Sequence, residues 1–263
     1  MKLKKRNLLW FVCLFCLSAS VVSAQKLWDK PYQQWSKEEA LKIMNSSPWS
    51  QSYQSAEGLA ATDQEQINRG SAEQDPRRQT KLGSSSRNLA PPVVVIRLHS
   101  ALPVRQAFVR LQQIEVGYDK WDEKKRAEFD AATKNILDCP LCKDYYIVTM
   151  AKSVNASGQG VDEGLFQTMG FEQLKGNVYL VNEKGEKREL VQFTPPKGGR
   201  DFAVFFFKRG KDKSDTFLTA ENKDLKFVFD NNFMGSKNPY ASLLPRSFDF
   251  KVSKLLIGEK VEF

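Results

Sequence analysis

The chain has 263 residues, of which 41% are hydrophobic, and a formal net charge of +9 at pH 7. Four of its 40 basic residues lie in the first six positions, which leaves 36 basic and 31 acidic residues, a net charge of +5, in residues 25–263. Basic and acidic residues are interspersed there, whereas nucleic-acid-binding proteins gather Lys and Arg on one face with aromatic residues between them. The composition therefore argues against a nucleic-acid partner, and the hydrophobic content suffices for a folded core.

The first 24 residues have the pattern of a secretory signal peptide. A basic start precedes an apolar run from Leu8 to Val22, and the small residues Ser23 and Ala24 end it. This order predicts cleavage after Ala24. An uncleaved anchor is the alternative, but the 17 residues from Leu8 to Ala24 are at the short limit for a membrane-spanning helix. We therefore expect a secreted or periplasmic protein with no integral membrane segment after cleavage.

Residues 25–49 are predicted to form a short helical segment. Ser36 and Glu39 have the spacing of a capping box, in which each side chain bonds the backbone N–H of the other residue. The segment also contains four large aromatic residues, Trp28, Tyr32, Trp35 and Trp49. These side chains are expected either to dock the helix on the main body or to form a contact for a partner or a sugar. Docking is favoured because large aromatic side chains contribute strongly to packing.

Residues 50–90 are predicted to be a polar, flexible linker. They are rich in Gln, Ser, Asn, Glu and Arg and contain few large apolar residues. A single α+β domain is predicted over 91–263, beginning with a buried strand at the apolar run Val93–Leu98. The interpretation is thus a tethered N-terminal helix followed by one compact domain.

Helical periodicity places most of the helices of this domain between residues 100 and 175. Ser100 is expected to cap the first helix, which should end at Gly117. Asp122 is expected to cap the second helix. A third helix is predicted over 162–175, where apolar residues recur at helical spacing.

Between residues 177 and 263 the apolar pattern changes to a period of two. Val178–Val181 and Glu189–Phe193 flank a turn sequence that ends in Gly185, which predicts a hairpin. Further short strands are predicted at Phe202–Phe207, Phe217–Thr219, Leu225–Phe229, Ser247–Val252 and Lys260–Phe263. The fold class is therefore α+β, with a helical and strand-containing first half and an antiparallel, sandwich-like or curled sheet in the C-terminal half.

Cys139 and Cys142 are the two cysteines outside the predicted signal peptide, and they lie between a predicted helix and a predicted strand. In an oxidising compartment a structural disulfide is the favoured interpretation. A redox-active pair is an alternative, but a thioredoxin-like motif opens a helix, whereas this one follows a helix and lacks the help of the helix dipole. Half of a metal site is the third interpretation. It needs further ligands, and His99 is the single histidine, so we predict no metal.

The sequence predicts no catalytic residue and no cofactor. A Ser-His-Asp hydrolase would need His99 as its base, and the Gly-x-Ser-x-Gly nucleophile motif is not present. The glycine-rich stretch 157–164 lacks both the Gly-x-Gly-x-x-Gly spacing and a Gly-Lys-Ser sequence, which leaves phosphate binding unsupported.

Two short blocks of the chain resemble a group of uncharacterised secreted bacterial proteins. The first contains Trp28-Asp29-Lys30-Pro31-Tyr32, Trp35-Ser36 and Ser47-Pro48-Trp49, and the second is Val93–Arg105. The resemblance implies a bacterial envelope protein. It brings no activity, cofactor or catalytic residue with it.

The combined evidence predicts an exported, non-enzymatic binding or scaffold protein of the bacterial envelope, with an envelope protein or a glycan as the partner. Two alternatives stay open. The first is a thiol–disulfide exchange protein that uses Cys139 and Cys142, and the second is a carbohydrate- or cell-wall-binding module with aromatic platforms.

Overall fold

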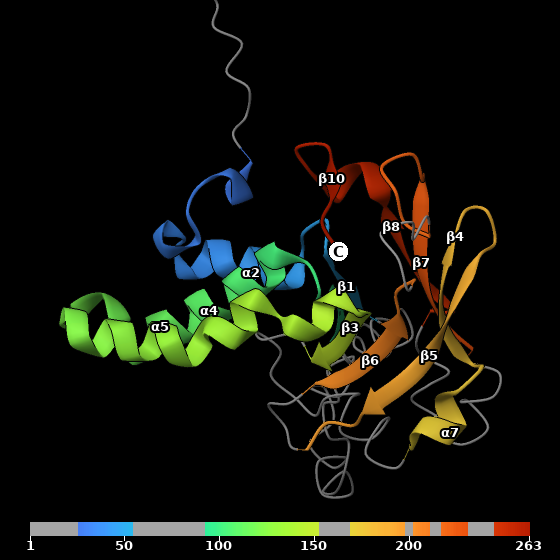
Figure 1. The fold of residues 1–263 in the computed structure, drawn as a ribbon, viewed down its shortest axis with the longest axis horizontal. Coiled ribbons are helices and arrows are strands. Elements are labelled where there is room, and N and C mark those ends of the chain that lie inside the picture. The colour runs from blue at the N-terminus through green and yellow to red at the C-terminus, as the bar shows by residue number, and fades with distance from the viewer. Residues whose placement is uncertain (1–25, 55–92, 153–168, 198–201, 211–216, 231–244) are drawn as a thin grey trace, which may run out of the picture.

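The structure of the protein is a computed structural model that describes residues 26–54, 93–152, 169–197, 202–210, 217–230 and 245–263. In these residues eight antiparallel strands form one strongly curved sheet, and three helices lie together at one side of it (Figure 1). The helices are α2 (Lys37–Asn45), α4 (Leu102–Val116), α5 (Glu123–Asp138) and the short α7 (Phe171–Leu174). The strands are β1 (Ser50–Gln54), β2 (Val93–Leu98), β3 (Tyr145–Lys152), β4 (Val178–Asn182), β5 (Lys187–Thr194), β6 (Ala203–Lys208), β7 (Asp224–Phe229) and β8 (Ser247–Lys251), with a separate ribbon of β9 (Leu256–Ile257) and β10 (Lys260–Val261).

The sheet is nearly closed into a barrel. Its strand order is β1-β2-β3-β6-β5-β4-β7-β8, so β1 and β8 are the two edges. These edges meet through side chains: Gln51 Nε2 donates to the backbone oxygen of Asp249 at 2.5 Å, and the rings of Tyr53 and Phe248 lie 6.2 Å apart. The predicted α+β class with a large antiparallel sheet is therefore confirmed. The predicted ordering into a first half and a separate C-terminal sheet is not confirmed, because β1, β2 and β3 belong to the same sheet as the C-terminal strands.

Aromatic side chains fill the interior of this curved sheet. Alternate residues of β6, β7 and β8 point inward, as the period-two pattern predicts. The rings of Phe205 and Phe227 are 5.4 Å apart, and those of Phe227 and Phe248 are 6.3 Å apart, so the aromatic contacts cross from one strand to the next. Phe205, Phe207 and Phe227 are fully buried. The curved sheet therefore encloses a packed core.

The N-terminal segment is part of the same compact unit. Trp35 and Trp49 are 0% exposed and belong to the main core, and β1 pairs with β2 over its whole length. Residues 50–54 of the predicted linker are therefore a strand of the sheet. Its remaining residues, like Ala24 and the predicted signal peptide, lie outside the described residues.

Most of the predicted helix ends are confirmed. Ser36 and Glu39 form the capping box of α2, Gly117 ends α4 in the left-handed conformation, and Asp122 accepts a hydrogen bond from the Lys125 N–H. These signals act over three or four residues, so they depend little on the rest of the fold.

The predicted cap at Ser100 is wrong. Ala101 is the N-cap residue of α4 and provides no side-chain cap. Ser100 Oγ instead accepts a hydrogen bond from the Ile147 N–H at 2.7 Å, which ties the start of α4 to β3. The Leu102 N–H at the helix start donates to Glu262 Oε1 at 2.9 Å. The cap is thus supplied by a residue far away in the sequence.

Two other sequence predictions fail within the described residues. Of the helix predicted over 162–175, the described part is helical only in α7, and Gly170 is extended. Phe217–Thr219 is not a strand; Phe217 is fully buried, and its carbonyl accepts a hydrogen bond from the Asn182 side chain at 2.9 Å. Residue burial, and not strand pairing, explains the apolar character of that stretch.

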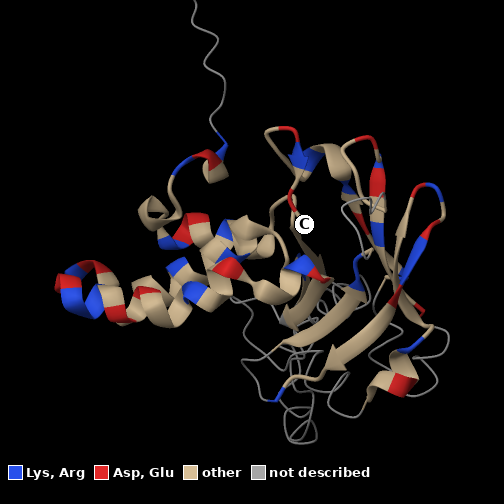
Figure 2. Ribbon diagram, in the orientation of Figure 1, with Lys and Arg blue, Asp and Glu red and all other residues tan. Residues whose placement is uncertain are grey.

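Charged residues of both signs lie side by side on the helices and on the hairpins of the sheet (Figure 2). This distribution fits the interspersed charges of the sequence. Among the residues that the structure describes, no helix has the length and apolar character needed to cross a membrane.

Candidate functional site

A disulfide closes the turn between α5 and β3. Cys139 ends α5, residues Pro140–Lys143 form one 3-10 turn, and a disulfide joins Cys139 to Cys142. The Cys142 N–H also donates to the Cys139 carbonyl at 2.9 Å. We call residues 139–143 the disulfide turn. The described residues contain no group of three or more His, Cys, Asp or Glu side chains that could hold a metal ion.

Cys139 has an uncommon backbone conformation. Its φ of 42° lies in the left-handed region, and it is the one non-glycine residue with positive φ in the described part of the chain. Its N–H donates to the Asn135 carbonyl at 3.0 Å, so this conformation ends α5 in the way that a glycine commonly does. The same residue is joined to Cys142 by the disulfide.

A cavity of about 660 Å³ lies beside the disulfide turn. We call it the polar cavity. Both cysteines line it, together with Arg105, Arg209 and residues 259–263 near the end of the chain. It brings together elements that are far apart in the sequence, namely the start of α4, the end of β6 and the tail after β10.

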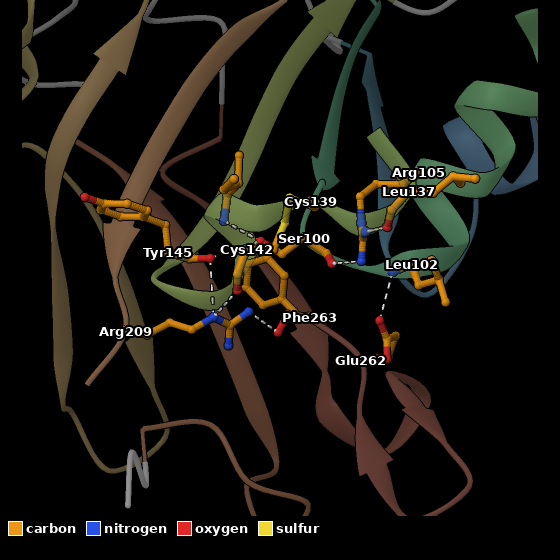
Figure 3. Close-up of a disulfide and its surroundings, with 11 residues drawn as sticks. Ser100, Leu102, Arg105, Leu137, Cys139, Cys142, Tyr145, Arg209, Glu262 and Phe263 are labelled. Atoms are coloured by element: carbon orange, nitrogen blue, oxygen red, sulfur yellow. Dashed lines mark hydrogen bonds between the residues drawn. A yellow bond between two sulfur atoms is a disulfide. The ribbon is translucent and has the colours of Figure 1, made fainter. Parts of the chain in front are cut away.

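The arginines of the polar cavity bind backbone carbonyl groups (Figure 3). Arg105 donates to the carbonyls of Leu137 and Ser100, the second at 3.1 Å. Arg209 donates from Nε to the Cys142 carbonyl at 2.9 Å and from Nη2 to the Phe263 carbonyl at 2.5 Å. These bonds hold the disulfide turn and the chain tail in place.

The tail is held by several further contacts. The backbone carbonyl of Glu262 accepts a hydrogen bond from the Trp49 indole at 2.7 Å, and its side chain caps α4. The Phe263 ring lies 5.2 Å from the Tyr146 ring, over which the Arg209 guanidinium lies at 3.8 Å. Burial lowers the pKa of Arg105, while the negative charges of Glu262 and Asp138 oppose this change.

Two more buried arginines hold the N-terminal segment. Arg97 Nε donates to the Met44 carbonyl in the last turn of α2 at 2.7 Å, and burial lowers the pKa of this arginine to about 10. Arg110 Nε donates to the Trp35 carbonyl at 2.9 Å, and its two terminal nitrogens bind Asp119 at 3.0 Å each. The carbonyls at a helix C-terminus lack partners within the helix and carry partial negative charge, so an arginine suits them.

Sequence reasoning missed these four arginines. The one local signal was Arg97, a charged residue inside the apolar run Val93–Leu98. A charge at such a position is stable when it is buried against a partner, and here the partner belongs to a helix more than fifty residues away.

A second concave surface also lies beside the disulfide turn. It has a volume of about 300 Å³ and lies between α4, α5 and the outer face of β3 and β6. We call it the apolar groove. Most of its lining is aliphatic or aromatic, and Cys139 lines both this groove and the polar cavity. Its polar side chains are those of His99 and Asn135; its apolar members are Phe108, Ile136, Pro140, Leu141, Ile147, Phe202, Val204 and Phe206.

His99 follows β2 and borders this groove. Its ring centre is 6.0 Å from that of Phe202. Burial lowers the pKa of His99 to about 4, with smaller contributions from the positive charges of Arg105 and Arg97. The imidazole is therefore neutral at neutral pH. No hydrogen bond joins it to a serine or carboxylate in the described part of the chain, so the geometry gives no support to a Ser-His-Asp site.

The four aromatic residues of the N-terminal segment differ in burial. Trp35 and Trp49 are fully buried, which agrees with the favoured interpretation of docking and leaves these two residues unable to contact a partner. Trp28 and Tyr32 are partly buried and pack edge to face against these two residues. The ring centres of Trp28 and Trp49 are 4.8 Å apart, and those of Tyr32 and Trp35 are 6.4 Å apart. The N-terminal segment therefore uses its aromatic residues mainly to attach α2 to the body.

Comparison of the chain with protein-family models, with curated proteins and with solved structures gave no significant match. The interpretation of the site therefore depends on its own geometry. That geometry is a disulfide-closed turn that borders both a polar cavity and an apolar groove.

Proposed function

We propose that this protein is an exported binding protein without catalytic activity, which holds its ligand at the concave surface around the disulfide turn. The observation that carries the proposal is the apolar groove, whose wall is fixed by a disulfide and by arginine–carbonyl bonds. Ligand sites are usually concave, mostly apolar and largely formed before binding, with a few polar groups that orient the ligand. The export and the bacterial envelope location of the proposal rest on the signal-like N-terminus and the family resemblance.

The exposure of Leu141 supports this location. Its side chain is 53% exposed and stands at the rim of the groove. Single exposed apolar residues are common, but this one continues an apolar lining. The binding surface proposed here thus replaces the N-terminal aromatic segment as the expected contact.

Thiol–disulfide exchange at the same turn has weaker support. Cys139 is 9% exposed and lies at the C-terminal end of α5, where the negative end of the helix dipole disfavours a thiolate. The reduction potential of the Cys139–Cys142 pair distinguishes the two functions. A value below about −300 mV is expected for a structural bond, and a value of about −120 to −230 mV would favour exchange.

The carbohydrate-binding alternative needs exposed aromatic platforms. Two of the four aromatic residues that suggested it, Trp35 and Trp49, are buried and unavailable for stacking. Retention of the protein on immobilised glycan or peptidoglycan, lost on substitution of Trp28 and Tyr32, would favour this alternative over the groove.

The proposed function is tested by incubating the processed protein with a bacterial envelope extract, reisolating it and identifying bound molecules by mass spectrometry. We expect a reproducible ligand that is lost in Leu141→Asp and retained in the control Val116→Asp. Val116 is 45% exposed at the end of α4 and lines neither the cavity nor the groove, so the control matches the change in charge and exposure. Equal retention by both variants would place binding elsewhere, and no bound molecule would contradict a binding function.

A further inference from the structure

The chemistry of the apolar groove defines the class of ligand that it can hold. Eleven residues line it, and none of them carries a charge at neutral pH, since the His99 imidazole is neutral there. A charged ligand would lose its hydration in this groove without gaining a counter-ion, which is unfavourable. The lining therefore selects a neutral molecule.

The His99 imidazole is partly buried at the groove, and no hydrogen bond joins it to any residue that the structure describes. Asn135 also lines the groove, but this residue is exposed to solvent. In ligand sites a few polar groups orient the ligand. His99 thus offers one nitrogen donor and one acceptor to a bound molecule.

Aromatic side chains set the shape of the groove. The rings of Phe108 and Phe202 meet edge to face with centres 6.3 Å apart, and His99 lies at 6.0 Å from the same Phe202 ring. Phe206 lies on the outer face of β6 and is nearly buried. Aromatic ligands fit such walls because they gain edge-to-face or offset contacts in addition to apolar burial. The volume of about 300 Å³ corresponds to the small end of known ligand sites.

We propose that the apolar groove binds a small, neutral aromatic molecule that carries one hydroxyl group, and that His99 forms a hydrogen bond with this hydroxyl. The inference rests on the proposed binding function and names its ligand class. The proposed occupant is a free molecule, because the groove of about 300 Å³ is at the small end of known ligand sites.

The test uses 1-naphthol as the probe, with naphthalene, 1-naphthoate and 1-naphthylmethylamine as comparison compounds, and measures each dissociation constant by fluorescence titration of the full-length processed protein. We expect naphthol to bind about tenfold more tightly than naphthalene, because one hydrogen bond has about this effect. The anionic and cationic compounds should bind more weakly than naphthol. Equal affinity for all four compounds would overturn the proposal.

Three variants locate the site. His99→Phe keeps an aromatic ring and removes the hydrogen bond, so it should reduce naphthol affinity about tenfold and leave naphthalene affinity unchanged. Leu141→Asp changes an exposed side chain and should lower the affinity for both naphthol and naphthalene. Val191→Asp is the matched control, since Val191 is 42% exposed on β5 and does not line the groove. A loss of affinity in Val191→Asp equal to that in Leu141→Asp would contradict the assignment.

A peptide with a central tyrosine tests whether the occupant is a free molecule. We expect no competition between this peptide and naphthol, and competition would overturn the proposal in favour of a protein ligand. This experiment is independent of the envelope extract. Naphthol binding without a ligand recovered from the extract would support the groove chemistry and contradict the proposed function. A ligand recovered from the extract without naphthol binding would contradict the groove chemistry alone.

Discussion

The polar cavity and the apolar groove share the disulfide turn, yet they differ in what their polar groups do. The larger polar cavity contains Arg105 and Arg209, and both guanidiniums bind backbone carbonyls. In the smaller groove the His99 imidazole forms no hydrogen bond with a described residue, and Asn135 is exposed to solvent. The size and charge of a cavity therefore do not indicate a ligand site by themselves. In this protein the arginines of the polar cavity bind the backbone of the chain itself, whereas the imidazole at the groove has no such partner among the described residues.

The largest expected effect on the free energy of unfolding comes from an arginine of the polar cavity. Arg105→Leu removes the partners of the Leu137 and Ser100 carbonyls, which lie close to the disulfide turn. We expect the free energy of unfolding to fall by about 3 kcal/mol, because buried carbonyls lose charge-assisted hydrogen bonds. Urea unfolding with the disulfide intact measures this change.

The control for this variant is Lys134→Met. Lys134 forms an exposed ion pair with Asp138 one helical turn away, and such pairs contribute little to stability. We expect a change within about 0.5 kcal/mol. Similar losses in both variants would show that the arginine–carbonyl bonds are not special and would weaken the comparison.

A pH effect of similar maximum size is expected on the groove side. His99 has a pKa of about 4 in the folded protein and an ordinary value of about 6.5 when unfolded, since burial and the charges of Arg105 and Arg97 disfavour its protonated form. The unfolded chain therefore binds the proton more tightly, and stability falls as the pH is lowered from about 6.5 to about 4. The loss is at most on the order of 3 kcal/mol.

The measurement compares wild type with His99→Phe by urea unfolding at several pH values. The other titrating groups change in both proteins, so the difference isolates the histidine. A difference that stays constant between pH 7 and pH 4 would show that the imidazole is solvated in the folded state, and the groove would then be less apolar than its lining indicates.

Removal of the disulfide tests the contribution of the disulfide turn, which borders both the polar cavity and the apolar groove. The double variant Cys139→Ala with Cys142→Ala should lose about 2 kcal/mol, because the closed loop is short. Replacing Cys139 by glycine in place of alanine should restore about 0.5–1 kcal/mol, since φ at this residue is 42°. Both double variants should bind naphthol more weakly, because Cys139 lines the groove. Unchanged naphthol affinity would separate the turn from the groove.

The smallest expected effect concerns the tail. Glu262→Gln keeps an oxygen acceptor for the Leu102 N–H but removes the negative charge at the start of α4. We expect a loss of about 0.5–1 kcal/mol at low salt, which decreases as salt is added. A loss that is independent of salt would indicate a packing role for this side chain and not a charge–dipole interaction.

Local features of the fold could be predicted from the sequence, and non-local ones could not. The capping box of Ser36, the cap at Asp122 and the end of α4 at Gly117 were predicted because each depends on groups within about four residues. Ser100 was assigned to the wrong partner because the group that it binds, the Ile147 N–H, is 47 residues away. The polar sequence of β1 gave no strand signal, and its pairing with β2 makes it a strand.

For the site, the sequence alone favoured the Cys139–Cys142 bond, since two cysteines three residues apart, in a chain for which export is predicted, can reach each other without the rest of the fold. The tertiary structure decided which arginine binds which carbonyl, that Trp35 and Trp49 are buried, and that His99 borders an apolar groove. Each of these depends on elements brought together by the closure of the sheet. Hydrogen bonds and caps are determined by short stretches of chain, whereas the burial and the charge state of a side chain are determined by everything packed around it.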